Sequence, residues 1–122
     1  MAYAGGLNME AVAELKERID EHAQTAFALN YQIAGDPELS GEEYRACAAY
    51  VKICRDRGWP VEENFTNQPT AFRARVRRVE APIMKAAVLA EYDALPDVGH
   101  GCGHSANGAM SLLAALGLSE LK

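Results

Sequence analysis

Apolar residues recur at helical spacing in the first part of the chain. Between residues 9 and 33 they fall close to a 3.6-residue period, and charged residues occupy the other positions of the helical wheel. Asn8 precedes this pattern and is a residue type that caps helices, and the Gly-Asp-Pro sequence at 35–37 interrupts it. The pattern therefore predicts a long amphipathic helix over 9–33.

A second helix is predicted from a capping signal. Ser40 and Glu43 match a capping box, in which the hydroxyl and the carboxylate satisfy free backbone amides at a helix start. The helix then continues to about Gly58, a residue type that commonly ends helices. Cys47 and Cys54 lie seven residues apart on its apolar face, so we interpret both as small buried core residues.

After Gly58 the pattern changes to that of strands, predicted over 61–65, 71–79 and 83–92. In the middle strand apolar residues alternate with three arginines, Arg73, Arg75 and Arg77. A nucleic-acid-binding ribbon would have this alternation, but so would the charged outer face of an edge strand, which we favour. The run at 83–90 is almost continuously apolar and predicts a central strand covered on both faces.

Residues 105–118 are apolar nearly all round a helical wheel and predict a buried helix after a glycine-rich loop. Two helices, about three strands and this buried helix indicate an α/β fold. A crossover helix normally leads to a neighbouring parallel strand, and no strand pattern follows residue 118. We therefore expect residues 1–122 to be one segment of a larger domain.

Composition excludes several classes of protein. The 122 residues include 12 Lys and Arg against 17 Asp and Glu, a net charge of −5, which argues against a dedicated nucleic-acid binder. No apolar run approaches the roughly 20 residues of a membrane span, and residues 1–8 lack the pattern of a secretory signal. Three cysteines do not form a secreted disulfide framework. We expect a cytoplasmic protein with neither nucleic acid nor membrane as a partner.

Candidate chemistry is concentrated between residues 90 and 107. His100, Cys102 and His104 alternate with glycines shortly after a predicted strand that carries Glu91 and Asp93. Ligands of open α/β sheets bind at the carboxyl ends of strands, and glycine allows a loop to turn its alternate side chains toward one centre. Thiolate, imidazole and carboxylate are the ligand types of zinc and similar divalent ions. The segment therefore predicts a metal site.

Three other interpretations of this segment stay open. Gly101, Gly103 and Ala106 match a dinucleotide-binding fingerprint, but that motif follows its strand directly, whereas here residues 93–98 intervene. Cys102 could be a nucleophile beside a histidine base, although such partners are normally distant in sequence. The residues could also simply pack a tight turn.

These residues carry a resemblance to a known family. Glu-Tyr-Asp-Ala-Leu-Pro at 91–96, followed by Gly-His-Gly-Cys-Gly-His at 99–104, resembles the signature of the M20 metallopeptidases and amidohydrolases. The resemblance is closest to the branch with aminobenzoyl-glutamate hydrolases, aminoacylase-like dipeptidases and auxin-conjugate amidohydrolases. Residues 36–43 and the order of elements also resemble that family's amino-terminal part. The resemblance implies a zinc-exopeptidase-like α/β/α catalytic domain.

The resemblance also assigns roles to individual residues. Cys102 matches the ligand that bridges two metal ions, and His104 matches a ligand of one of them. Asp93 matches an aspartate that supports the site without binding the metal. Glu91 stands where many relatives outside this branch have a metal-binding histidine, and His100 matches a residue frequent in the branch that we do not assign as a ligand. The implied cofactors are two divalent ions, zinc or manganese.

By resemblance, the full-length enzyme hydrolyses an amide bond in N-acyl amino acids or dipeptide-like substrates. The family's general base and further histidine ligands have no counterpart here, so we expect the 122 residues alone to be inactive. The family's lid domain, which usually makes the dimer, is also without a counterpart, and we expect an unpaired sheet edge to cause self-association or homodimerisation. The alternative is a non-catalytic module that binds a structural metal or assembles with other chains.

Overall fold

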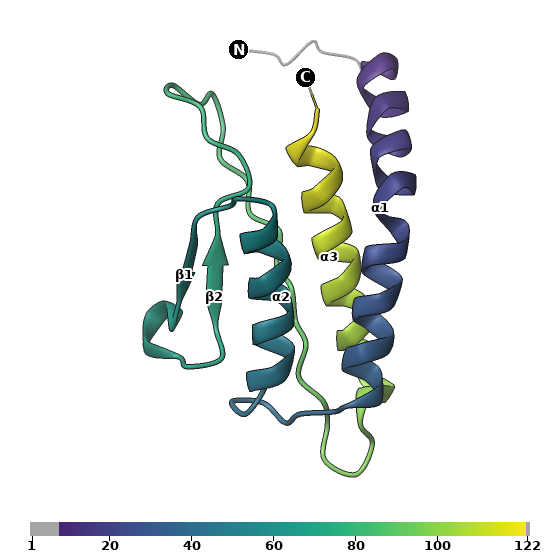
Figure 1. Ribbon diagram of the computed structural model, residues 1–122, viewed down its shortest axis with the longest axis vertical. Coiled ribbons are helices and arrows are strands. Elements are labelled where there is room, and N and C mark those ends of the chain that lie inside the picture. Colours follow the sequence, from purple (N-terminus) through teal and green to yellow (C-terminus); the bar gives the residue numbers. More distant parts are fainter. Residues whose placement is uncertain (1–7, 122) are drawn as a thin grey trace, which may run out of the picture.

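The computed structural model describes residues 8–121, which form three α-helices and a small antiparallel sheet (Figure 1). The helices are α1 (Met9–Gly35), α2 (Tyr44–Asp56) and α3 (His104–Ser119), and the strands are β1 (Val61–Glu63) and β2 (Phe72–Ala74). Two short 3-10 turns, η1 (Phe65–Asn67) and η2 (His100–Cys102), lie in the connections. α1 and α3 lie side by side, and α2 separates them from the sheet. The fold of the described part is therefore mixed α/β, as expected in that coarse sense.

The first and last helices agree closely with their patterns. The Asn8 side chain accepts hydrogen bonds from the backbone amides of Glu10 (3.0 Å) and Ala11 (3.3 Å), which confirms the predicted cap of α1. The buried positions of α1 include Leu29 and Ile33, on the face that packs toward the core. α3 begins one residue before the predicted helix and ends one residue after it.

The predicted capping box of α2 is wrong. Ser40 is exposed and lies in a turn with Gly41, whose φ of 86° is left-handed and does not fit the first turn of a right-handed helix. The carboxylate of Glu38 is the actual cap and accepts from the backbone amides of Arg45 (3.0 Å) and Ala46 (2.8 Å). The helix therefore begins at Tyr44, three residues later than a cap at Ser40 predicts.

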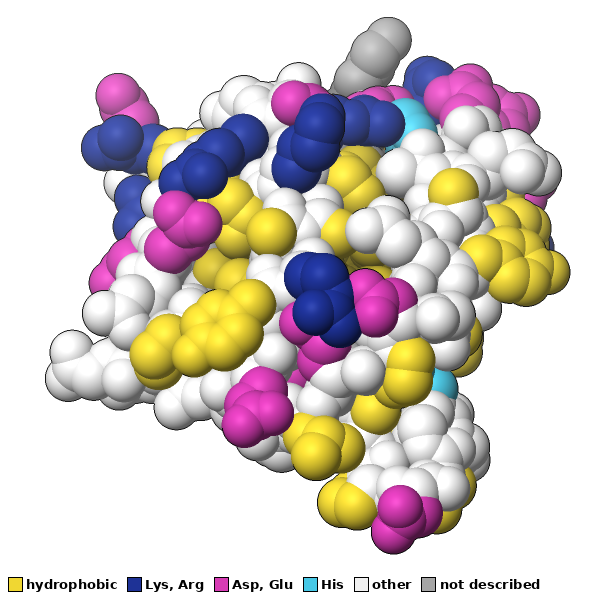
Figure 2. Space-filling model, turned by 60° about the horizontal axis from the view of Figure 1, so that its bottom comes forward, with side chains coloured by type: hydrophobic (Ala, Val, Ile, Leu, Met, Phe, Trp, Pro, Cys, Tyr) yellow, Lys and Arg dark blue, Asp and Glu magenta, His cyan; other side chains and the backbone are white. Residues whose placement is uncertain are grey.

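The sheet is shorter than predicted but keeps the predicted alternation. β1 pairs with β2 in antiparallel register, with Val61 opposite Ala74 and Glu63 opposite Phe72. The three alternating arginines are exposed, and the apolar residues between them are partly buried. Basic side chains lie mostly toward the upper part of the face in Figure 2, close to acidic ones. Arg73, for example, forms an ion pair with Glu62 (2.6 Å).

The predicted third strand at 83–92 is the largest error. In the described chain, residues 83–92 form no strand. Ile83 and Leu89 are 100% and 79% exposed instead of buried. The physical reason is that its backbone forms no strand pairing with any other described segment, so no sheet covers its apolar side chains and they face solvent. Only from Ala90 onward does the segment pack into the molecule, where Tyr92 and Ala94 are buried.

The core lies between the helices and the sheet. Tyr50 and Leu116 are its largest fully buried side chains, and the Tyr50 ring stacks on Tyr92 at a centroid distance of 5.1 Å. Cys47 and Cys54 are buried as predicted, and burial raises the pKa of both thiols. No helix within residues 8–121 is long and apolar enough to cross a membrane.

Candidate metal centre

The loop that precedes α3 is fixed by backbone hydrogen bonds at its base. The Ala94 amide donates to the Glu38 carbonyl (2.7 Å), which ties the loop to the turn before α2. Leu95 and Gly99 then exchange two backbone hydrogen bonds (2.9 and 3.0 Å), and Gly99 has a φ of 63° that favours glycine. The chain thus reverses at the lower end of the molecule in Figure 1 and returns through η2 to the start of α3.

His104, the first residue of α3, lies between two carboxylates. Its Nδ1 is 2.8 Å from Asp93 Oδ1 and 3.2 Å from the Asp93 carbonyl oxygen. Its Nε2 is 3.4 Å from Glu91 Oε2. The structure therefore brings together three residues that the sequence singled out, with one carboxylate at each ring nitrogen.

This surrounding changes the acidity of the imidazole. Burial opposes the charged form, but the hydrogen bond and negative charge of Asp93, together with the charge of Glu91, raise the pKa of His104 above its ordinary value. The carboxylates of Glu91 and Asp93 thus give the site the negative charge that a cation site requires.

Cys102 lies beside this group but does not complete it. Its Sγ is 3.9 Å from the Asp93 carbonyl oxygen, and the thiol is exposed and free. Gly103, with a φ of 86°, separates Cys102 from His104 and lets the chain turn into α3. The thiol therefore lies near the Asp93 carbonyl that also faces the imidazole, and it is accessible from solvent.

His100 has a different environment. Both of its ring nitrogens are buried, and neither has a hydrogen-bond partner among residues 8–121. Burial lowers the pKa of His100, while the negative charge of Asp93 acts in the opposite direction. Among the described residues His100 therefore forms no hydrogen bond with the other residues of the site, and its omission from the ligand set stays a prediction.

The residues present fit a divalent cation. In metal sites a ligating histidine almost always donates its second ring N–H to a carboxylate or carbonyl, which fixes the ring orientation. His104 shows this arrangement, because Nδ1 faces Asp93 and leaves Nε2 directed toward Glu91. With the thiol of Cys102 nearby, the donor types are those that hold zinc and similar ions.

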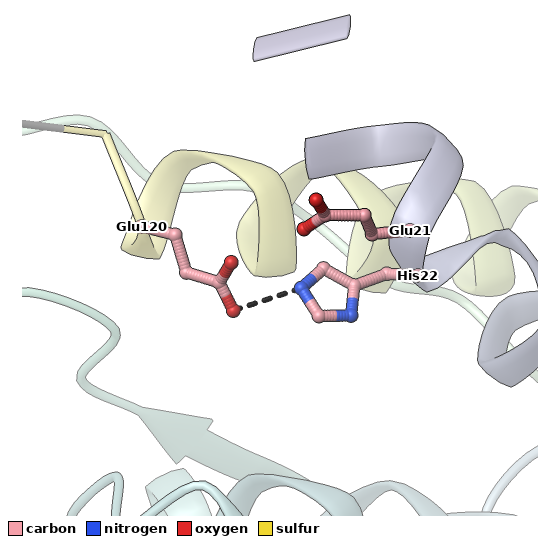
Figure 3. A group of neighbouring side chains, drawn as sticks. All are labelled: Glu21, His22 and Glu120. Carbon is pink, nitrogen blue, oxygen red and sulfur yellow. Dashed lines mark hydrogen bonds and ion pairs between the residues drawn. The ribbon is translucent and has the colours of Figure 1, made fainter. Parts of the chain in front are cut away.

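A second group of potential ligands lies at the opposite end of α3. Glu21 and His22 of α1 and Glu120, just after α3, place a ligand atom each within 4.8 Å of one another (Figure 3). His22 Nε2 is 2.8 Å from Glu120 Oε1. The sequence carries no local signal for this group, because 98 residues separate His22 from Glu120 and neither belongs to a local motif.

Protein hydrogen bonds hold the side chains of this second group together without a bound ion. Arg57 donates to His22 Nδ1 (2.9 Å) and to Glu120 Oε1 (3.0 Å), and Arg18 binds both carboxylate oxygens of Glu21 (3.1 and 2.9 Å). Since Nδ1 accepts from Arg57, Nε2 carries the proton and donates to Glu120. Both ring nitrogens are therefore used, and two guanidinium groups oppose a cation there. We interpret the hydrogen-bonded group of His22, Arg57 and Glu120, here called the polar clasp, as a structural contact between the helices.

The candidate metal centre is thus built from Glu91, Asp93, Cys102 and His104.

The comparisons with known proteins bear on its chemistry. No protein-family model matches the chain. The chain is 41% identical over 110 residues to the Xaa-Arg dipeptidase of Mus musculus, in an alignment that covers 84% of this chain and 25% of the mouse protein.

Two further curated relatives also match most of this chain but only a small part of their own length. The Xaa-Arg dipeptidase of Homo sapiens is 36% identical over 113 residues (84% of this chain, 26% of the relative). Thermostable carboxypeptidase 2 of Saccharolobus solfataricus is 30% identical over 118 residues (85% and 30%). The chain therefore spans only 25% to 30% of the length of these relatives. Over that stretch, it is similar to proteins named as peptidases.

Proposed function

We propose that this chain supplies part of the metal site of an M20-type amidohydrolase with a zinc-exopeptidase-like catalytic domain. The relevant branch is the one with aminoacylase-like dipeptidases and aminobenzoyl-glutamate hydrolases. The whole enzyme hydrolyses an amide bond in dipeptide-like substrates or N-acyl amino acids. The observation that carries the proposal is the contact of His104 Nδ1 with Asp93 at 2.8 Å, which leaves Nε2 for a metal ion. The similarity to two dipeptidases and a carboxypeptidase supports the reaction class.

Each residue of the site has a separate task in this proposal. Cys102 and His104 are metal ligands, and Asp93 orients the imidazole of His104. Glu91 faces the ligating nitrogen of His104 and adds negative charge that favours a cation. When bound, two zinc or manganese ions supply an activated water and a Lewis acid for the scissile carbonyl.

The names of the relatives suggest the first substrates to test. Two of them are named as acting on Xaa-Arg dipeptides, so a dipeptide with a carboxy-terminal arginine is the first candidate substrate. We further propose that the 122 residues alone do not turn over this substrate. A two-metal site with a general base requires more ligands than Cys102, His104 and the neighbouring carboxylates provide.

Cobalt titration of the 122-residue chain tests the proposed ligands. A thiolate that binds Co²⁺ gives a charge-transfer absorption in the near ultraviolet, which we expect for the wild-type chain. Cys102→Ser should abolish this absorption, and His104→Gln should weaken binding at least tenfold. His22→Gln is the matched control and should leave cobalt binding unchanged. Binding that survives both Cys102→Ser and His104→Gln, or that depends on His22, would contradict the assignment.

The alternative function is a non-catalytic assembly module, and one observation favours it. The apolar segment at 83–89 is exposed and contains Ile83, Met84, Val88 and Leu89. Self-association or homodimerisation through this segment would bury these side chains. Sedimentation analysis over a range of concentrations tests association through this segment. The cobalt titration separates the two functions, because an assembly module without the metal site shows no thiolate–cobalt absorption.

A further inference from the structure

α3 contacts the extended segment Leu89–Asp93 at three successive points. At its start His104 contacts Asp93, and two turns later Ser111 Oγ donates to the Leu89 carbonyl. Between them Gly108 faces the Glu91 carbonyl oxygen. His104 to Ser111 covers roughly 10 Å of helix, and Leu89 to Asp93 covers roughly 13 Å of extended chain. Helix and segment therefore run antiparallel in one defined register.

The middle contact leaves no space for a side chain. A Cβ atom at Gly108 would lie 2.1 Å from the Tyr50 hydroxyl oxygen and 2.5 Å from the Glu91 carbonyl oxygen. Real Cβ atoms essentially never approach closer than 3.0 Å. The φ of Gly108 is not positive, so the helical backbone alone does not require glycine here. The close approach of α3 to Tyr50 and Glu91 requires it.

Tyr50 is the rigid side of this contact. The residue is 1% exposed, its ring stacks on Tyr92 and lies tilted against Phe72, and its hydroxyl has no hydrogen-bond partner among residues 8–121. Its ring therefore cannot move aside without disturbing the core. The Glu91 carbonyl belongs to the backbone between the carboxylates of the site, and the segment on either side of it is tied to α3 by the contacts of Leu89 and Asp93.

We infer that Gly108 is a positioning residue of the candidate metal centre, which sets the distance of His104 from Glu91 and Asp93. His104 and Gly108 are four residues apart and lie on the same face of α3. A methyl group at Gly108 requires a displacement of about 0.9 Å to relieve the contact with Tyr50. A displacement of this size one helical turn away breaks or distorts the 2.8 Å hydrogen bond to Asp93.

The inference rests on the proposed function only for the identity of the bound ion. The positions of His104, Asp93 and Gly108 are properties of the chain without metal. We therefore choose one readout that needs no metal and one that does.

The experiment compares Gly108→Ala with Gly117→Ala in the 122-residue chain. Both glycines are buried in α3, but a Cβ at Gly117 would meet Leu15 and Ile19 of α1 at 3.0 and 3.1 Å, far along the helix from the site. The metal-free readout is the ring ¹⁵N spectrum of His104, assigned by its disappearance in His104→Gln. The metal readout is the affinity for Co²⁺ with its thiolate absorption.

We expect Gly108→Ala to lose the signal of the hydrogen-bonded Nδ1–H of His104 and to bind Co²⁺ about 10- to 100-fold more weakly. Gly117→Ala should keep the signal and the affinity even if its melting temperature falls. Adding Tyr50→Phe to Gly108→Ala removes the closest contact and should restore part of both readouts.

The outcomes separate the two claims. A Gly108→Ala chain with the His104 signal and cobalt affinity of Gly117→Ala overturns the positioning role, and so does a folded double variant without recovery. If Gly108→Ala does not fold, the double variant carries the test alone. A wild-type chain that shows the His104 hydrogen bond but no thiolate–cobalt absorption contradicts the proposed function. The positioning role of Gly108 is then tested by the ring ¹⁵N spectrum of His104 alone.

Discussion

The start of α2 depends on the buried carboxylate of Glu38, and its removal should destabilise the whole chain. The Glu38 side chain is 5% exposed and accepts from the backbone amides of Arg45 at 3.0 Å and Ala46 at 2.8 Å. These amides belong to the first turn of the helix, where backbone donors have no partner within the helix itself. In Glu38→Ala both amides lose their acceptor.

The magnitude follows from these contacts. Hydrogen bonds to a charged group contribute about 1.5–3 kcal/mol each, but burying the carboxylate costs part of that gain. Loss of a helix cap costs about 0.5–2 kcal/mol, and the charge also interacts favourably with the helix dipole. We therefore expect Glu38→Ala to lower the free energy of unfolding by about 2–3 kcal/mol. Glu38→Gln, whose amide oxygen can still accept one bond, should cost about 1 kcal/mol.

Urea unfolding followed by far-ultraviolet circular dichroism measures both variants. Ser40→Ala is the matched control, because its hydroxyl is the cap that the sequence predicts, whereas the structure leaves Ser40 exposed in the preceding turn. An exposed residue of this kind should change stability by less than about 0.5 kcal/mol. If Ser40→Ala destabilises the chain as much as Glu38→Ala, the assignment of the cap to Glu38 is wrong.

Hydrogen bonds from His22 and Arg57 lower the pKa of Glu120 below its ordinary 4.5, so the carboxylate stabilises the fold above that pH. The destabilisation by Glu120→Gln in urea should be present at neutral pH and vanish as the pH falls through the lowered pKa. Cys102 should react rapidly with a thiol reagent at pH 8, and the two buried thiols only after unfolding. Leu89→Lys should reduce self-association in sedimentation, whereas Tyr31→Lys, equally exposed on α1, should not.

Sequence patterns predicted the elements whose stabilising contacts are local. The period of α1, its Asn8 cap and the apolar run of α3 each describe interactions within a few residues, so their bounds are nearly correct. The cap of α2 was wrong because Gly41 turns the chain before the helix begins and a carboxylate five residues upstream of Glu43 takes the amides. The strand predicted at 83–92 failed for a different reason. An apolar run indicates that burial is favourable, but a strand also needs a second segment to pair with.

The polar residues at 91–104 and the pair of His22 and Glu120 show that the sequence predicts polar clusters only where their residues are close along the chain. Glu91, Asp93, Cys102 and His104 lie within 14 positions, so their spacing and residue types predict a cluster, and the structure brings Glu91, Asp93 and His104 into contact. The clasp of His22 and Glu120 has no such local signal, because it arises from the packing of α1 against α3. The role of Gly108 is also hidden from the sequence. Its glycine is required by the position of Tyr50, which lies on another helix.

Glu38 and Gly108 act on the same loop in separable ways. The Glu38 carboxylate caps α2, but it is the Glu38 backbone carbonyl that holds the Ala94 amide at the base of the loop. Replacement of the Glu38 side chain therefore weakens the fold and leaves this backbone contact in place. Gly108→Ala acts on the contact that orients His104 toward Asp93. Stability and site geometry should thus respond to different substitutions, because the loop is held by backbone bonds and the imidazole by the register of α3.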